Sequence, residues 1–178
     1  IGKPPTRALR QGRVTFYEHE QVGAKMAVAI ARRLRLSNAQ QDLIECFVRW
    51  HMYPVQLWRS DNFGPQHIHR FYQRTGSVGP LIVVFTLADY LAKGEDLVTS
   101  PQFAKHQQMV EEFLYAYFCR QAEVVAPKPL LNGHELVSLA RRPPGPWLKK
   151  AEQALLEAQV VGRVKNKSDA TRWLQQWL

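Results

Sequence analysis

Residues 22–52 read VGAKMAVAIARRLRLSNAQQDLIECFVRWHM, and this stretch decides the fold class. Apolar side chains recur every three or four positions between Val22 and Leu34, which predicts a helix over 22–35. Ser37 followed by Gln40 is a capping-box pattern, and it predicts the start of a second helix over 38–52 that Pro54 closes. Two such helices in succession are typical of a helical domain.

The rest of the chain repeats the helical pattern. Further helices are predicted over 65–75, 78–93, 101–122, 133–140 and 146–161, and from about residue 168 to the end. The segment 78–93 is rich in β-branched residues, but its length between turn signals favours a buried helix over a strand. No segment shows convincing strand alternation, so we expect an all-α fold. Pro127 and Pro129 mark a linker, which predicts domains over 1–125 and 126–178.

The net charge of +9 is concentrated at the two ends of the chain. Residues 1–40 hold eight Lys and Arg against two acids, and residues 126–178 hold nine against four, whereas the middle is slightly acidic. Nucleic acid is the commonest polyanion that such a distribution would attract, and a basic protein without such a partner is the alternative. The chain has neither a run of eighteen apolar residues nor a secretory leader pattern, so we expect a cytoplasmic protein without a membrane span.

The motifs of several enzyme classes are absent from the sequence. It contains no GxGxxG, GxxxxGK[ST], HExxH or D-x-D pattern, so we expect no site for a nucleoside triphosphate with magnesium. Cys46 and Cys119 lie in apolar helical runs and are predicted to be buried free thiols. Asp89 lies inside the apolar segment 78–93, where a carboxylate is costly to bury without a partner. It is therefore the first acid to examine, with a bond to a neighbouring loop as the alternative.

Short motifs follow one another through the first 91 residues in a recognisable order. They are Gly2-Lys3-Pro4, His19-Glu20, RLRLSN at 33–38, VRWHM at 48–52 and LADYL at 87–91. Together they resemble the HD-type domain of bacterial tRNA nucleotidyltransferases and poly(A) polymerases, the CCA-adding family. In that family Leu-Leu-His-Asp-Ile usually precedes Gly-Lys-Pro, so the resemblance implies a fragment in which Ile1 follows the His-Asp pair. The family often has Gly at the position of Glu18.

The C-terminal fifty residues are similar to the ending of the same family. A Leu-x-Gly-x-[DE]-Leu start, a Pro-Gly-Pro turn and a closing helix match at Leu131, Gly133, Glu135, Leu136, Pro144, Gly145, Pro146, Gln159, Gly162, Arg163 and Ala170. Gly145 would allow a tight approach before a helix whose first turn, preset by Pro146, can receive a phosphate. The alternative is an ordinary turn with solvated lysines.

The resemblance implies an HD-like helical domain over 1–125 and a tRNA-binding tail over 126–178. The chain would hold tRNA, or another RNA, while a catalytic head outside it adds nucleotides to the 3′ end. The head would use magnesium, and the fragment itself would need no cofactor. The expected RNA contacts are Arg32, Arg33, Arg35, Arg141, Arg142, Lys149, Lys150, Arg163 and Lys165.

The resemblance also implies a pocket of the HD type. The HD superfamily binds a divalent metal through a His, a His-Asp pair and a later Asp, and in this chain only Asp89 matches that set. We therefore expect an incomplete metal site at Asp89, with His19 and His51 lining a phosphate pocket beside it. One alternative function is a metal-dependent phosphohydrolase built on an intact HD region. Another is a helical scaffold that self-associates as a homodimer.

Overall fold

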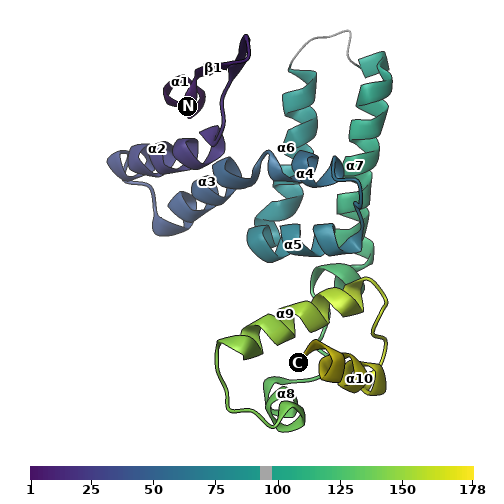
Figure 1. The fold of residues 1–178 in the computed structure, drawn as a ribbon. Helices are drawn as coiled ribbons and strands as arrows, with labels where there is room; N and C mark the ends of the chain where they lie inside the picture. The colour runs from purple at the N-terminus through teal and green to yellow at the C-terminus, as the bar shows by residue number, and fades with distance from the viewer. Residues whose placement is uncertain (93–97) are drawn as a thin grey trace. The chain divides into compact units, whose positions relative to one another are not determined.

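The structure is a computed structural model that describes residues 1–92 and 98–178, and the regular secondary structure of these ranges is helical apart from one short hairpin (Figure 1). The all-α prediction is therefore confirmed. The chain forms two compact units, the first made of residues 1–61 and 74–114 and the second of residues 62–73 and 115–178. These units are defined by packing, so the predicted functional boundary between residues 125 and 126 stays a prediction.

The elements follow in chain order. They are α1 (Lys3–Thr6), β1 (Ala8–Arg10), β2 (Arg13–Thr15), α2 (His19–Arg33), α3 (Asn38–Trp50), α4 (Tyr53–Trp58), α5 (Pro65–Thr75), η1 (Gly76–Val78), α6 (Gly79–Leu91), α7 (Pro101–Cys119), η3 (Gln121–Val125), α8 (Gly133–Ala140), α9 (Pro146–Val160) and α10 (Lys167–Trp177). Within the described ranges, no helix is both long enough and apolar enough to cross a membrane.

The helix ends agree closely with those predicted from caps and turn residues. At the start of α3, Gln40 N–H donates to Ser37 Oγ at 3.3 Å, and Ser37 N–H donates to Gln40 Oε1 at 2.9 Å. Asn132 and Glu135 make the same reciprocal pair at the start of α8. Such boxes satisfy N–H groups that a helix leaves without partners, which explains why the boundaries could be predicted.

The structure differs from the predicted elements at several places. Pro54 was predicted to close the second helix. In the structure α3 ends at Trp50, and Pro54 lies in the first turn of a further helix, α4. A proline suits that position because its missing N–H would have no partner there. The hairpin β1–β2 was also missed. Its turn residues, Gln11 and Gly12, both have positive φ, and its strands of three residues are too short for alternation to be visible.

Gly2 is buried directly against the start of α2. A Cβ atom at Gly2 would collide with the carbonyl oxygen of His19 and would lie 2.7 Å from the amide nitrogen of Gly23. A Cβ at Gly23 would in turn lie 3.4 Å from Val48 Cγ1 of α3. Gly2 and Gly23 therefore let the N-terminal segment, α2 and α3 come close together.

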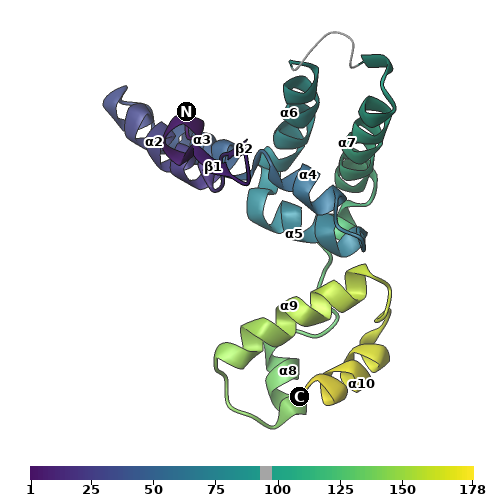
Figure 2. The same ribbon diagram turned by 45° about the horizontal axis from the view of Figure 1, so that its top comes forward.

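α6 and α7 run side by side in both views of the ribbon (Figures 1 and 2). Ile82 and Val83 of α6 and Met109 of α7 are fully buried. The imidazole Nε2 of His106 lies 3.0 Å from the hydroxyl of buried Thr86. The expectation that 78–93 is a buried helix holds for one face of α6 but is wrong for the other, which exposes Leu81, Val84, Phe85 and Leu91.

Polar contacts, one buried and one at the surface, join the parts of the second unit. The Nδ1 atom of buried His69 on α5 lies 2.8 Å from the carbonyl oxygen of Val124 in η3. Arg70 donates from Nε to Glu157 Oε1 of α9 at 2.8 Å, and its second N–H donates to Oε2. This hydrogen-bonded pair lowers the pKa of Glu157 below its ordinary value. The ion pair therefore stabilises the folded state at pH values above the ordinary carboxyl pKa. This stabilisation is lost as the pH falls through the lowered pKa of Glu157.

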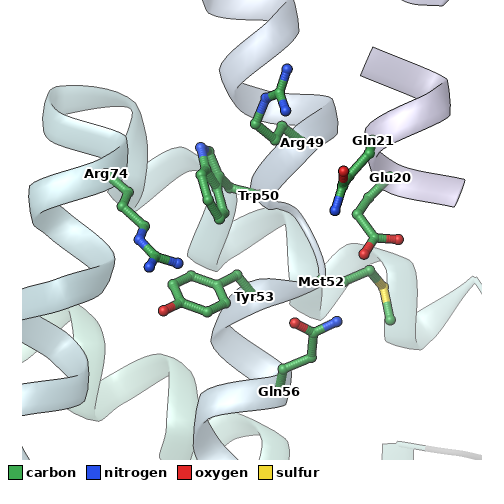
Figure 3. A pocket seen from close by; sticks show the side chains of 8 residues that line it. All are labelled: Glu20, Gln21, Arg49, Trp50, Met52, Tyr53, Gln56 and Arg74. Atoms are coloured by element: carbon green, nitrogen blue, oxygen red, sulfur yellow. The ribbon is translucent and has the colours of Figure 1, made fainter. Parts of the chain in front are cut away.

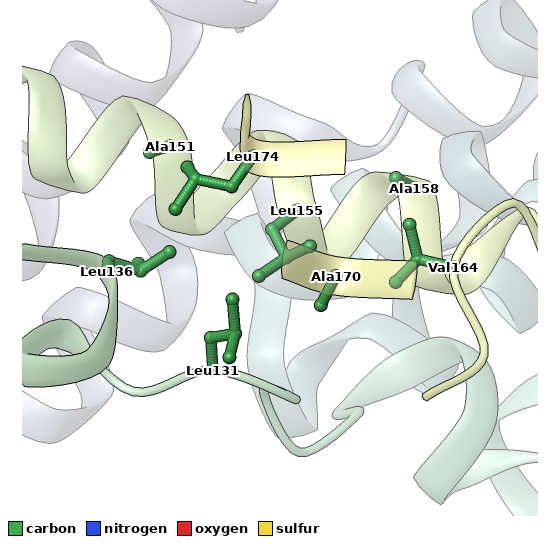
Figure 4. Packing of buried hydrophobic residues seen from close by; sticks show 8 residues of the cluster. All are labelled: Leu131, Leu136, Ala151, Leu155, Ala158, Val164, Ala170 and Leu174. Atoms are coloured by element: carbon green, nitrogen blue, oxygen red, sulfur yellow. The ribbon is translucent and has the colours of Figure 1, made fainter. Parts of the chain in front are cut away.

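Helices α8, α9 and α10 enclose one apolar cluster, which we call the tail core (Figure 4). Its buried members are Leu131, Leu136, Ala151, Leu155, Ala158, Val164, Ala170 and Leu174. Three of these residues lie on α9 and the others come from the segments before and after it, so each short helix depends on α9 for a surface to bury against.

We expect Gly2→Ala to lower the free energy of unfolding by about 3 kcal/mol, because the added methyl meets backbone atoms that cannot rotate away. The matched control is Gly145→Ala, whose Cβ would lie 3.5 Å from Trp147 Cδ1, an ordinary contact. Urea unfolding of the two variants measures the difference. Equal small decreases for both would show that the close approach at Gly2 is not needed.

Candidate nucleic-acid interface

Six of the nine predicted RNA contacts lie in the tail, in two groups at opposite ends of α9. Arg141 is the C-cap of α8 and Arg142 follows it, whereas Lys149 and Lys150 lie in the first turns of α9. Arg163 and Lys165 follow its last turn, and all six side chains are exposed. The fifteen residues of α9 separate the groups by roughly 20 Å, given the axial rise of a helix.

Other cations of the second unit form ion pairs with carboxylates, whereas these six side chains do not pair with any described carboxylate. Lys167 pairs with Glu135, Arg172 pairs with Asp169 and Arg70 pairs with Glu157. In the part of the chain that the structure describes, none of the six candidate cations makes a salt bridge with a carboxylate. Within residues 1–92 and 98–178, no carboxylate therefore neutralises these charges, which leaves them available to an external anion.

The turn before α9 is held by Trp147 and Arg142. The indole Nε1–H of Trp147 donates to the carbonyl oxygen of Pro143 at 2.8 Å, and the Arg142 guanidinium lies 5.5 Å from the Trp147 ring centroid. Pro146 occupies the first helical turn, and no side chain caps the helix at Gly145. The N–H groups of this turn are thus not satisfied by a capping side chain, as the phosphate hypothesis requires.

The expectation that Gly145 allows a tight approach before a phosphate-binding helix end stays a prediction, because the contacts within the protein do not require glycine there. Gly145 has an extended backbone with φ of −177°, which any residue can adopt. An added Cβ would be in ordinary contact with Trp147. A glycine at this position is therefore not explained by the packing of the tail.

Two of the predicted RNA contacts have left-handed backbone conformations that favour glycine. Arg35, just after α2, has φ of 55°, and Arg141, at the C-terminal end of α8, has φ of 47°. A left-handed residue at a helix end satisfies the last carbonyls, and a side chain there costs about 1 kcal/mol relative to glycine. Strain of this kind is consistent with a function for the side chain.

The remaining predicted cations lie at the C-terminal end of α2, in the first unit. Arg32 and Arg33 form its last turn, and Arg32 Nε donates to Gln41 Oε1 of α3 at 3.3 Å. All three arginines of this group are exposed. They form a second basic surface, separate in sequence from that of the tail.

The structure brings His19 and His51 together. His19 is the first residue of α2 and His51 is the C-cap of α3, and their rings meet edge to face with centroids 5.7 Å apart. His19 Nδ1 lies 2.8 Å from the carbonyl oxygen of Phe16. The Nε2 atom of His19 is buried and has no hydrogen-bond partner. Among the described residues, no other buried side-chain nitrogen or oxygen lacks one. A buried polar atom without a partner is costly, so this nitrogen is a natural contact for a ligand.

Asp89 is only half-buried, which corrects the expectation of a carboxylate inside a buried helix. It lies one turn beyond Phe85, whose ring centroid is 6.3 Å from that of His51. Across residues 1–92 and 98–178, no three His, Cys, Asp or Glu side chains are grouped so that they could hold a metal ion. The described residues therefore do not form a metal site by themselves. Of the predicted buried thiols, Cys46 is half-buried and Cys119 is exposed.

Sequence reasoning missed a second basic and aromatic cluster. The Arg74 guanidinium lies 5.0 Å from the Trp50 ring centroid and 4.8 Å from that of Tyr53. The only signal in the sequence is the spacing of the two aromatic residues, three positions apart. Arg74 is too distant along the chain for any spacing rule to connect it with them.

Comparisons with known proteins agree on one family. The family model described as tRNA nucleotidyltransferase domain 2 matches residues 68–174. The chain is 32% identical over 180 residues to the A-adding tRNA nucleotidyltransferase of Deinococcus radiodurans, covering 99% of this chain and 39% of that protein. It is 30% identical to the CC-adding tRNA nucleotidyltransferase of Thermus thermophilus, covering 99% of this chain and 38% of that protein. The chain thus spans about two fifths of the length of these relatives, and no solved structure matches it significantly.

We expect Arg141→Gly to raise the free energy of unfolding by about 0.5–1 kcal/mol and to weaken RNA binding, because it removes both the backbone strain and the charge. Arg141→Ala is the matched control, since alanine keeps the strain and removes the charge. It should weaken RNA binding equally without any gain in stability. Thermal unfolding and a filter-binding titration measure the two effects, and unchanged RNA affinity in both variants would exclude Arg141 as a contact.

Proposed function

Because the chain belongs to the tRNA nucleotidyltransferase family, we propose that it is the part of such an enzyme that holds tRNA while nucleotides are added to the 3′ end. The family membership also confirms the resemblance seen in the motifs. The reaction itself is assigned to another part of the full-length protein, which would hold the magnesium. This assignment rests on the absence of a nucleoside triphosphate motif from the sequence.

The observation that carries the proposal is the pair of uncompensated basic groups at the ends of α9. A surface of six exposed cations, none paired with a carboxylate of the described residues, would gain free energy from releasing the counterions of an RNA backbone. The tail core fixes α9 against α8 and α10, so the spacing of the two groups is held by packing. Fixed spacing favours binding to a folded RNA over a flexible strand.

The two relatives help to assign separate roles to this chain and to the rest of the full-length protein. One is named as A-adding and the other as CC-adding, and the chain is nearly equally similar to both. We therefore assign the choice of added nucleotide to the rest of the protein. The segment shared by both relatives is assigned to binding the tRNA that each of them must hold.

We expect the double variant Lys149→Glu/Arg163→Glu of the full-length protein to bind tRNA at least about tenfold more weakly at moderate salt. The slope of log affinity against log salt should become shallower by about two, one for each phosphate that the variant no longer neutralises. Fluorescence anisotropy with labelled tRNA across a salt series measures both quantities. A tRNA without its acceptor and T arms should already bind weakly to the unchanged protein.

Arg120→Glu is the control for a general change in charge, because the Arg120 side chain is partly exposed and already paired with Glu123. It should leave the affinity within about twofold. An unchanged affinity and salt slope in the double variant would exclude the tail as the tRNA-holding surface.

The contact between His19 and His51 favours a second candidate function, hydrolysis of phosphomonoesters. The buried Nε2 of His19 lacks a partner, and it lies beside a second imidazole. Imidazoles can donate hydrogen bonds to phosphate oxygens and move protons near neutral pH. The described residues do not group three possible metal ligands, so the two imidazoles are the groups that would act on the phosphate.

If this candidate is correct, the full-length protein will hydrolyse p-nitrophenyl phosphate, with or without an added divalent metal. His19→Ala should then lower the rate at least about tenfold, which corresponds to roughly one hydrogen bond to the phosphate. The Lys149→Glu/Arg163→Glu variant should keep the full rate. No hydrolysis by the unchanged protein under any metal condition would eliminate the candidate.

Self-association and cytoplasmic location stay predictions. The exposed apolar face of α6, formed by Leu81, Val84, Phe85 and Leu91, is the surface on which a homodimer would most readily form.

A further inference from the structure

A pocket of about 370 Å³ opens in the first unit where α2, α3, α4 and the end of α5 meet (Figure 3). Its lining combines aromatic, amide and charged side chains: Glu20, Gln21, Arg49, Trp50, Met52, Tyr53, Gln56 and Arg74. This volume is in the range of natural small-ligand sites. None of these lining residues belongs to the histidine pair or to the basic surfaces described above, although Glu20 adjoins His19.

The aromatic wall of the pocket is suited to a planar ligand. Trp50 and Tyr53 are half-buried, and their ring centroids are 5.2 Å apart. The Arg74 guanidinium lies within 5.0 Å of both ring centroids, which holds the two rings together by cation–π attraction. In Figure 3 these rings lie between Arg74 on one side and Glu20, Gln21 and Met52 on the other. Clusters of aromatic and arginine side chains are the usual surfaces for stacking nucleic-acid bases.

The charges of the pocket have opposite signs on its two sides. Arg49 is paired with Glu45 on its own helix, so its charge is largely neutralised. Within the described ranges Arg74 makes no salt bridge with a carboxylate, and its contacts are with the two rings. Glu20 supplies a carboxylate across the pocket, with Oε2 3.3 Å from His19 Nδ1. A ligand that spans the pocket therefore needs an anionic group at one end and hydrogen-bond donors at the other.

We propose that this pocket binds one guanine nucleotide, with its phosphate at Arg74, its base against Trp50 and Tyr53, and its Watson–Crick edge at Glu20. Guanine presents two adjacent donors, N1–H and N2–H, which a carboxylate can accept together. Adenine presents an acceptor at N1 and would be repelled by the same carboxylate. Gln21 and Gln56 supply amides that can donate to the remaining acceptors of the base and the ribose.

The nucleotide could be free in solution or could be one unstacked residue of a bound RNA, and the pocket chemistry is the same in both cases. The proposal does not rest on the tRNA-holding role of the tail. Its experiment therefore begins with a free nucleotide and the full-length protein, and it adds RNA only to identify the source.

Isothermal titration with GMP, AMP and ribose 5-phosphate tests the pocket. We expect GMP to bind at least about tenfold more tightly than AMP, and ribose 5-phosphate to bind most weakly. Arg74→Ala and Trp50→Ala should each weaken GMP binding at least about tenfold, whereas Trp50→Phe, which keeps a stacking ring, should weaken it by less than about threefold. Glu20→Gln should abolish the preference for GMP over AMP.

Arg59→Ala is the matched control for Arg74→Ala, because Arg59 is an exposed arginine at the end of α4 that does not line the pocket. Its GMP affinity should equal that of the unchanged protein. Nucleotide bound elsewhere in the full-length protein would also be unaffected by the pocket variants. Because Arg74 is exposed, this variant tests the proposal even if Trp50→Ala fails to fold.

The affinity for tRNA of the same variants identifies the source. Weaker tRNA binding in Arg74→Ala and Trp50→Ala, with Arg59→Ala unchanged, assigns the pocket to a guanine residue of the RNA. Unchanged tRNA affinity together with weaker GMP binding assigns it to free nucleotide. The proposal is overturned if neither affinity changes in these variants, or if AMP binds as tightly as GMP.

Discussion

The close backbone contact between Gly2 and the start of α2 is the constraint on which the N-terminal part of the structure depends. Because neither Gly2 nor Gly23 carries a side chain, the segment before the hairpin lies against the carbonyl of His19, while Gly23 faces Val48 of α3. The α2–α3 hairpin then places the first residue of α2 beside the last turn of α3. That arrangement brings His19 to His51 and places α2 side chains at the edge of the pocket around Trp50.

The tail depends in the same way on α9. This helix contributes Ala151, Leu155 and Ala158 to the tail core, and it carries a basic group at each end. Its apolar face is therefore fixed by packing, while its ends remain exposed and positively charged. Short helices such as α8 and α10 are marginal alone, so their burial against α9 is what gives the basic surface a defined shape.

The candidate sites could be predicted from the sequence only in part. The clustering of arginines and lysines at the two ends of the chain was visible in the charge distribution. The sequence did not show which of these cations pair with carboxylates, because the partners are far apart in the chain, as in Lys167 with Glu135 and Arg70 with Glu157. The left-handed backbone at Arg141 was also invisible, since nothing in its neighbours requires it. The same holds for Glu18, which has φ of 60° at the position where the family often has glycine.

The sequence by itself determined the helices, their caps and the basic character of both ends. These features come from interactions between residues three or four positions apart, such as Ser37 with Gln40, and from composition, so neighbouring residues contain the information. Only the tertiary structure decided which face of α6 is exposed, which cations lack partners, and that Arg74 meets Trp50 and Tyr53. Those outcomes depend on side chains that are distant in sequence and are brought together only when helices pack, so no local spacing can specify them.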